Sequence, residues 1–219
     1  MPIAAVSPSS YECTLTVDCA IFGFQDNTLK LLLIKRAVEP FKDEWLLPGG
    51  SMKEDNSLEE TVDQVLFDLT GIHNIHHEQV KCYSKVHRHP VKRVVTLCFY
   101  ALIKPENHQI KAKNYVSEVS WFTLDKLPKL AIDHSKLVKD ALHTLRQNLS
   151  RTIILGELLP SKFTLKELQN LYEGIMAEKL DRRNFRKRIF QLNRLKATGQ
   201  IKKGVKGGPE LYELKPIHQ

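Results

Sequence analysis

The chain has 219 residues, of which 42% are hydrophobic and 26% are charged, a balance typical of a globular protein that buries a core. No apolar run reaches the ~18 residues of a membrane span, the first residues lack the pattern of a secretion signal, and the four cysteines (residues 13, 19, 82 and 98) have no CxxC spacing. These features exclude secreted, membrane and disordered proteins and predict a reduced, cytoplasmic protein.

The net charge of +8 lies entirely in the last third of the chain. Residues 1–150 contain 18 basic and 18 acidic side chains, whereas residues 151–219 contain 15 basic and 7 acidic ones. A local positive field of this kind attracts polyanions. The asymmetry predicts two domains with separate roles, one over residues 1–150 and one over residues 151–219.

The first part of the chain alternates between strand and helix patterns. Apolar and alternating segments predict strands at residues 12–23, 29–35, about 79–87, 93–103 and 118–122, with a turn at residues 25–27. The segment WLLPGG at residues 45–50 is expected to interrupt regular structure. A helical period predicts helices at residues 57–70, ended by Gly71, and at about 135–148.

The last third predicts two helices followed by a hairpin. Thr164 and Glu167 form a capping box for a helix that runs to about Met176. Asp181 is expected to cap a second helix from Arg182 to about Lys196. Its inward stripe is Phe185, Ile189, Leu192 and Leu195. Turns at residues 198–200 and 206–209 would start two short strands, and this order is that of a winged helix-turn-helix.

Basic side chains surround the apolar stripe of the second helix. A DNA recognition helix needs this division, because its apolar side holds it rigidly while cationic groups reach phosphates and base edges. The side chains expected to contact double-stranded DNA are Arg182, Arg183, Asn184, Arg186, Lys187 and Arg188 on the helix and Lys202, Lys203 and Lys206 in the hairpin. The alternative is that this basic module docks a protein.

Residues 10–150 resemble a Nudix domain. The resemblance rests on residues 31–36, 45–50 and 50–72, where Gly50 and Gly71 frame the Nudix box. The acidic and arginine positions of that box hold Asn56, Gln64, Val65, Asp68 and Leu69. Family members gather Mg²⁺ with three carboxylates on one helix face, and the metal activates water. With only one acidic residue left, we expect no catalytic residue, no metal site and no cofactor.

A Nudix-like domain with a degenerate box, followed by a basic winged helix, resembles the Nudix-related transcriptional regulators (NrtR). Residues 127–134, residues 158–164 with 168–173, and residues 181–188 add to this resemblance. It implies an α+β fold: a Nudix-like α/β/α sandwich domain followed by a C-terminal winged helix-turn-helix. It also implies a homodimeric repressor that releases an inverted-repeat operator when a small effector binds. The implied effector is a sugar such as L-arabinose, toward whose branch the resemblance leans, or ADP-ribose or a related NAD metabolite.

The effector pocket is expected to use cationic groups and close backbone. The residues predicted to bind the ligand are Arg36, Gly49, Gly50, His87, Arg88 and Arg93. The segment His87–Pro90 stands where many family members have Asp-Arg-Asp-Pro, so two imidazoles replace two carboxylates and a different or pH-sensitive ligand is conceivable. The alternative function is an active Nudix hydrolase of a nucleoside diphosphate derivative with a basic nucleic-acid-binding tail.

Overall fold

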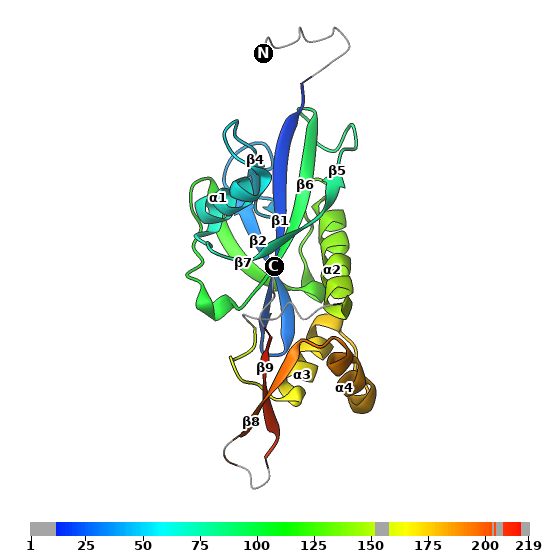
Figure 1. Cartoon of the computed structure of the whole chain (residues 1–219). Helices are drawn as coiled ribbons and strands as arrows, with labels where there is room; N and C mark the ends of the chain where they lie inside the picture. Colours follow the sequence, from blue (N-terminus) through cyan, green and yellow to red (C-terminus); the bar gives the residue numbers. More distant parts are fainter. Residues whose placement is uncertain (1–11, 152–157, 203, 205–207, 216–219) are drawn as a thin grey trace.

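The computed structural model of the chain describes residues 12–151, 158–202, 204 and 208–215, with backbone only at residues 150 and 151 (Figure 1). Within these residues, seven strands form one sheet: β1 (Thr14–Gln25), β2 (Thr28–Arg36), β3 (Trp45–Leu46), β4 (Gly49–Ser51), β5 (His77–Tyr83), β6 (Val94–Ile103) and β7 (Val116–Thr123). The main order is β3-β2-β1-β6-β5, with β4 paired to β1 and β7 paired to β2. Only the β1–β6 pair of this sheet is parallel in the described residues.

Two helices, α1 (Leu58–Thr70) and α2 (His134–Arg151), cover opposite faces of the sheet. Successive side chains of a strand point to opposite faces. Ala20 and Phe22 therefore pack in the apolar cluster of α2, whereas Cys19 and Ile21 pack in that of α1. Gly71 ends α1 in the left-handed conformation, with φ 79°, as the sequence predicts. Two short 3₁₀ helices, Pro105–Asn107 and Leu124–Lys126, flank β7.

The C-terminal part has the element order of a winged helix: α3 (Leu165–Met176), α4 (Arg182–Gln191), β8 (Leu195–Ile201) and β9 (Glu210–Leu214). The capping box of Thr164 and Glu167 is present at the start of α3. The backbones of Phe163 and Tyr212 pair with each other, which ties the segment before α3 to the hairpin. The predicted fold class, α+β with a Nudix-like domain followed by a winged helix, is confirmed.

The two parts of the molecule share one apolar cluster. It runs from the α2 face of the sheet into the interior of the winged helix. Arg146 of α2 donates a hydrogen bond from Nε to the carbonyl oxygen of Ile175 in α3, over 3.0 Å. The backbone of Gly174 lies so close to the β1–β2 hairpin that an added Cβ would come within 2.5 Å of the Phe24 ring. The winged helix therefore packs directly on the tip of this hairpin.

Several predicted boundaries were wrong. Helix α4 ends at Gln191 instead of about Lys196, because Asn193 turns the chain with φ 51°, and Leu195 already belongs to β8. The turn expected at residues 198–200 is an irregularity inside β8, where the pairing register shifts and Gly199 has φ 68°. Residues 45–50 form the short strands β3 and β4, and β5 ends at Tyr83 instead of His87.

Among the described residues, no helix combines the length and the apolar character that crossing a membrane requires.

Candidate functional site

A cavity of about 390 Å³ opens at one end of the Nudix-like sheet. It lies between β1, β2 and β4 on one side and the segments around residues 40, 90 and 115 on the other. The polar and glycine residues that line it are Thr16, Asp18, Arg36, Gly49, Gly50, Ser51, Arg88, His89, Lys92, Tyr115 and His134. Small-ligand pockets in proteins are concave sites of comparable size, in which a few polar groups set the orientation of the ligand.

A buried charge network forms the floor of this cavity. The guanidinium of Arg88, whose side chain is 2% exposed, donates two hydrogen bonds to the carboxylate of Asp133, over 2.7 and 3.2 Å. The same guanidinium lies 3.9 Å from Asp18, which also accepts a hydrogen bond from the hydroxyl of Thr96 over 2.8 Å. A forked arginine–carboxylate pair has a fixed geometry. The pair with Asp133 therefore fixes the position of Arg88 at the floor of the cavity.

The imidazole of His134 completes the network. Its Nδ1 accepts the backbone N–H of Leu47 over 3.0 Å, so this nitrogen carries no proton. Its Nε2, 3.7 Å from a carboxylate oxygen of Asp18, then carries the proton of the neutral ring. Burial lowers the pKa of His134, although the charge of Asp18 opposes this shift. The lowered pKa therefore favours the neutral form of His134, with its Nε2 on the side of Asp18.

The two glycines serve close packing. A Cβ on Gly49 would collide with the carboxylate of Asp18, and a Cβ on Gly50 would come within 2.8 Å of Val65. Strand β4 pairs with β1 at these positions, with Asp18 opposite Gly49 and Val17 opposite Gly50. The glycines thus let β4 and α1 approach the strand that carries Asp18.

Arg36 and Tyr115 form a wall of the cavity. The Arg36 guanidinium lies over the Tyr115 ring, 4.9 Å from its centre, and donates from Nε to the carbonyl oxygen of Val38 over 3.0 Å. Burial raises the pKa of Tyr115, and the neighbouring Arg36 partly offsets this rise. The wall therefore offers a cation and a phenol that stays protonated at neutral pH.

The structure brings together four of the six predicted ligand residues: Arg36, Gly49, Gly50 and Arg88. His87 is exposed and does not line the cavity. Arg93 also lies outside the lining, because its Nη1 donates to the carbonyl oxygens of Ser84 and Lys85 over 2.7 and 3.1 Å. Arg93 therefore holds the loop that leads to Arg88.

His89 lines the cavity in place of His87, with its ring edge-on to Phe41 at 5.5 Å between centres. Burial is the main cause that lowers the pKa of His89. Sequence reasoning missed Asp18, Tyr115 and His134 as members of the site. A signal existed for Asp18, since it is the charged residue in the otherwise apolar run from Val17 to Phe22, and buried charges need partners.

The positions of the degenerate box have structural contacts instead of a ligand set. Val65 packs against Gly50, and Leu69 is buried in an apolar cluster with Ile34. The amide of Gln64 donates to the carboxylate of Asp68 over 2.8 Å. Asn56 lies in the loop before α1, where its backbone N–H binds the carbonyl oxygen of Lys53. In the described part of the chain, no group of three or more His, Cys, Asp or Glu residues is placed to hold a metal ion.

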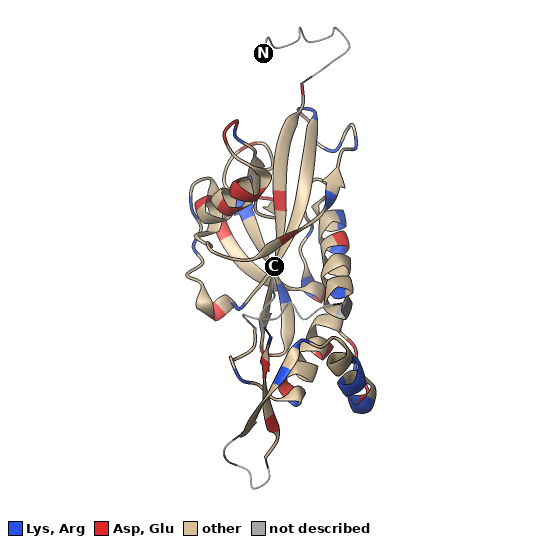
Figure 2. Cartoon of the chain, in the orientation of Figure 1, with Lys and Arg blue, Asp and Glu red and all other residues tan. Residues whose placement is uncertain are grey.

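A second candidate surface is the outer side of α4, which Figure 2 shows covered by basic residues. Phe185 and Ile189 are buried, and the Tyr172 ring lies edge-on to Phe185 at 5.3 Å between centres. Asp181 caps the helix by accepting the backbone N–H of Asn184 over 2.8 Å. The predicted DNA-binding residues of this helix are all exposed: Arg182, Arg183, Asn184, Arg186, Lys187 and Arg188.

The predicted hairpin contacts are only partly described. Lys202 forms an ion pair with Glu167, with 2.6 Å between Nζ and Oε1, so the hairpin is tied to the start of α3. Lys203 and Lys206 lie outside the described residues. Among the described residues, no carboxylate pairs with Arg182, Arg183, Arg186 or Lys187. The charges of these four residues are thus directed to solvent.

Known proteins match both parts of the chain. A family model described as the NrtR DNA-binding winged helix domain matches residues 155–214, and one described as the NUDIX domain matches residues 14–141. A relative from Acinetobacter baylyi, named ADPR responsive transcriptional repressor NtrR, is 35% identical over 218 residues, which cover 97% of this chain and 86% of the relative. The chain belongs to the NrtR family.

Two solved structures of an NrtR from Shewanella oneidensis extend this comparison. Its complex with a 27mer DNA is 34% identical, with a TM-score of 0.76 over 92% of this chain and 93% of that one. Its NUDIX domain in complex with ADP ribose is 34% identical, with a TM-score of 0.58 over 65% of this chain and 95% of that one. The expected lean toward the sugar-responsive branch finds no support in these NrtR relatives, whereas ADP-ribose does.

Proposed function

We propose that this NrtR-family chain is a transcriptional repressor that binds operator DNA through α4 and releases it when ADP-ribose or a related nucleotide occupies the Nudix-like cavity. The observation that carries the proposal is the exposed basic side of α4 on a helix whose other side is buried. The family relationship and the names of the relatives support the same function. The boundary near residue 150 stays a prediction, since residues 152–157 lie outside the described residues.

The geometry of α4 suits entry into a major groove. Burial of Phe185 and Ile189 fixes the helix on the domain, and the Asp181 cap fixes its first turn. The guanidinium of Arg186 lies over the Phe190 ring, 5.6 Å from its centre, so part of the helix surface is ordered before DNA binds. Two copies of the chain would read half-sites about 34–36 Å apart, which is one turn of the duplex.

The cavity suits an anionic nucleotide better than a neutral sugar. Arg36 and Lys92 line it, and no ion pair engages either of them in the described part of the chain. The Tyr115 ring adds a flat surface with a protonated hydroxyl. Arg88 forms hydrogen bonds to Asp133, so we assign to it the role of holding the floor of the cavity in place. We assign binding of the diphosphate to Arg36 and Lys92.

We infer that the chain binds its effector without hydrolysing it. The box positions that carry the metal-binding carboxylates in Nudix hydrolases hold Val65, Asp68 and Leu69, and two of these side chains have no metal-binding atom. The remaining carboxylate is engaged by the Gln64 amide. Three carboxylates on one helix face are what concentrates Mg²⁺ at a diphosphate, and this face lacks them.

Strands β1 and β2 provide a route from the effector to DNA. Thr16, Asp18 and Arg36 line the cavity near one end of these strands. The hairpin at the other end carries Phe24 and packs on Gly174 of α3. A ligand that shifts the strands therefore shifts the base of the winged helix. The coupling needs only about 1–3 kcal/mol of differential affinity between the two arrangements.

The DNA-binding proposal is tested with a fragment selected from genomic DNA near physiological salt. An arginine that contacts a base edge should, when replaced in Arg183→Ala or Arg186→Ala, weaken binding of that fragment by about 1–3 kcal/mol. An arginine that contacts a phosphate should instead, when replaced, lower the slope of log affinity against log salt concentration by about 0.9. Fluorescence anisotropy measures both quantities. The matched control is Lys126→Ala on the Nudix-like domain, which should bind as the parent does.

Two results would contradict DNA recognition by α4. One is the absence of any enriched inverted repeat above charge-matched DNA. The other is a pair of α4 variants with unchanged affinity and salt slope.

The effector proposal is tested by calorimetry with ADP-ribose and with L-arabinose. We expect ADP-ribose to bind and Arg36→Gln to weaken it by about tenfold, because a charge-assisted hydrogen bond contributes more than a neutral one. Lys53→Gln, an exposed residue outside the lining, is the control. Turnover of ADP-ribose that Asp68→Asn abolishes would instead establish the hydrolase alternative.

A further inference from the structure

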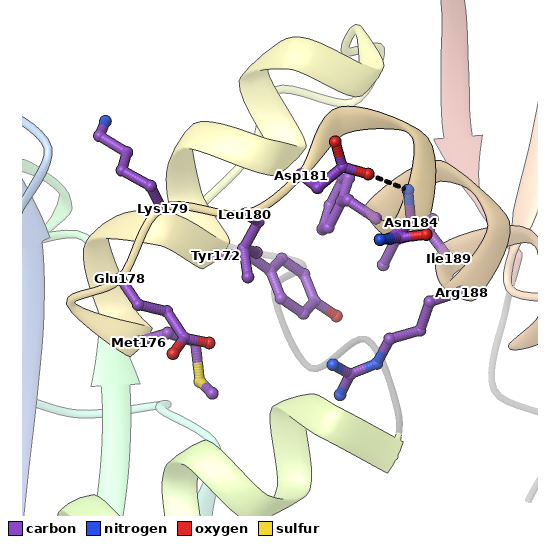
Figure 3. Close-up of a pocket in the computed structure, with 10 residues that line it drawn as sticks. Tyr172, Met176, Glu178, Lys179, Leu180, Asp181, Asn184, Arg188 and Ile189 are labelled. Atoms are coloured by element: carbon purple, nitrogen blue, oxygen red, sulfur yellow. Dashed lines mark hydrogen bonds between the residues drawn. The ribbon is translucent and has the colours of Figure 1, made fainter.

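Two cavities of the molecule differ in what their cationic side chains contact. In the cavity of about 260 Å³ between α3 and α4, Arg188 already has an interaction partner, and the Asp181 carboxylate accepts the capping hydrogen bond of α4 (Figure 3). In the Nudix-like cavity, Lys92 lines the wall, and no ion pair engages it within the described residues. The position of Lys92 therefore decides whether its charge reaches a ligand.

Lys92 belongs to the loop between β5 and β6, residues 84–93, which other side chains hold at its base and at the cavity floor. Arg93 donates two hydrogen bonds to carbonyl oxygens at the start of the loop. The guanidinium of Arg88 forks onto the Asp133 carboxylate. None of these contacts involves residues 89–92, which form the tip of the loop. Another group must therefore hold the tip in place.

The imidazole of His89 is that group. Its Nδ1 accepts the backbone N–H of Val91 over 3.2 Å and, at a longer distance of 3.4 Å, the backbone N–H of Lys92. Pro90 has no N–H, so these are the first two backbone donors after His89. Within the described structure, neither N–H has another acceptor. His89 thus makes the hydrogen bond from side chain to backbone that asparagine makes in an Asx turn.

This use of Nδ1 places the ring proton on the other nitrogen. A neutral imidazole has one N–H, so with Nδ1 as an acceptor the proton lies on Nε2. Burial, and then the charges of Lys92 and two neighbouring arginines, lower the pKa of His89, which keeps the ring neutral at neutral pH. The ring also lies edge-on to Phe41, with 5.5 Å between centres. His89 is therefore held in a fixed orientation as an acceptor.

We propose that His89 is a positioning residue of the effector site, whose Nδ1 holds the loop tip so that the Lys92 ammonium reaches the diphosphate of the effector. This role rests on the function proposed above, because an anionic effector must occupy the cavity. His89 acts through the backbone of Val91 and Lys92 and needs no contact with the ligand. An asparagine oxygen at the same place should therefore replace Nδ1, whereas a side chain without an acceptor there should not.

The first test uses the full chain without a ligand. The proton–nitrogen correlation spectrum of the His89 ring should show a protonated Nε2 and an unprotonated Nδ1 at neutral pH. We expect the amide hydrogen of Val91 to exchange about fivefold faster or more in His89→Ala, because a broken hydrogen bond opens the local structure. His87→Ala, at an exposed histidine of the same loop outside the cavity lining, is the matched control and should leave the exchange rate unchanged.

Two results of this first test would overturn the proposal. One is a proton on Nδ1 of His89 at neutral pH. The other is an exchange rate of Val91 that His89→Ala leaves unchanged.

The second test measures the affinity for ADP-ribose by calorimetry in three variants at residue 89. His89→Asn keeps an acceptor near the place of Nδ1, so we expect its affinity to stay within about threefold of the parent. His89→Ala lacks the acceptor, and His89→Gln can place its amide only near Nε2, so we expect both to bind about tenfold more weakly. Equal losses in the Asn and Ala variants, or parental affinity in the Gln variant, would overturn the role of Nδ1.

A double-mutant cycle tests whether His89 acts through Lys92. We expect Lys92→Gln to weaken ADP-ribose binding by about tenfold, and His89→Ala to have little further effect in this background, since coupled neighbours are not additive. Additive losses would refute action through Lys92. Failure of the parent chain to bind ADP-ribose would refute the proposed function and the role of Lys92 in it, whereas the ligand-free test would still decide whether His89 holds the loop tip.

Discussion

The arginines in the two charged regions of this molecule differ in burial and in pairing with carboxylates. In the Nudix-like cavity, the Arg88 side chain is 2% exposed and forks onto Asp133. On α4, Arg183 and Arg186 are exposed and no described carboxylate pairs with them. Buried charges need partners within the protein, whereas exposed charges remain available to a partner outside it. The first region therefore shapes a cavity, and the second presents a surface.

The same comparison separates predicted ligand residues by role. Arg36 lies at the cavity wall, Arg88 lies at its floor, and Arg93 holds the loop between β5 and β6. All three are arginines on one domain, but only Arg36 has a guanidinium on the cavity wall without a carboxylate partner in the described structure. An arginine near a cavity is thus available to a ligand only when no carboxylate of the protein pairs with its guanidinium.

The largest expected effect comes from removing the buried arginine. Arg88→Ala leaves Asp18 and Asp133 without their cation, and breaking such a buried pair typically destabilises a protein by about 3–5 kcal/mol. Arg183→Ala, on the exposed side of α4, should change the free energy of unfolding by less than about 0.5 kcal/mol. Urea unfolding measures both. Equal losses would mean that the two arginines have similar environments.

A smaller effect is expected at the junction that joins the two regions. Gly174→Ala places a Cβ within 2.5 Å of the Phe24 ring and 2.9 Å of the backbone oxygen of Asn27. Overpacking of this kind destabilises by about 1–3 kcal/mol. In a Phe24→Ala background the same substitution should have a clearly smaller effect, and a double-mutant cycle by urea unfolding measures the difference. Additive effects would show that the two residues do not press on each other.

The smallest expected effect is a pH dependence from the cavity floor. Burial lowers the pKa of His134 in the folded state, whereas the unfolded residue titrates near 6.5. Below pH 6.5 the unfolded chain therefore binds the proton first, and the stability falls as the pH falls toward the lower pKa of the folded state. The slope per histidine reaches at most about 1.4 kcal/mol per pH unit.

Two variants isolate this slope. His134→Asn should flatten the change of unfolding free energy below pH 6.5, even if it lowers stability at every pH. The pKa of His89 is lowered in the same direction, so His89→Asn serves as the companion variant and should flatten the curve less, because His89 is less buried. A slope that His134→Asn leaves unchanged would contradict a neutral, buried His134.

The sequence by itself determined the local elements and the division of charge. The apolar alternation of β1, the capping box at Thr164 and the cap at Asp181 each depend on residues close in the chain, and all three are present. The end of α4 at Gln191 was not predicted, because it depends on a turn of the chain at Asn193, whose φ is positive. After this turn, Leu195 pairs with β9 as the first residue of β8. Local signals mark where helices start better than where a tertiary contact ends them.

Only the tertiary structure decided which polar residues share the cavity. Asp18, Arg88 and His134 are far apart in the sequence, and the parallel pairing of β1 with β6 and the start of α2 bring them together. The hydroxyl of Tyr172 is likewise buried without a hydrogen bond in the described structure only because α3 and α4 pack around it. Sequence patterns report the burial of apolar faces, since burial follows a regular period, but the partners of a buried polar group depend on how distant segments meet.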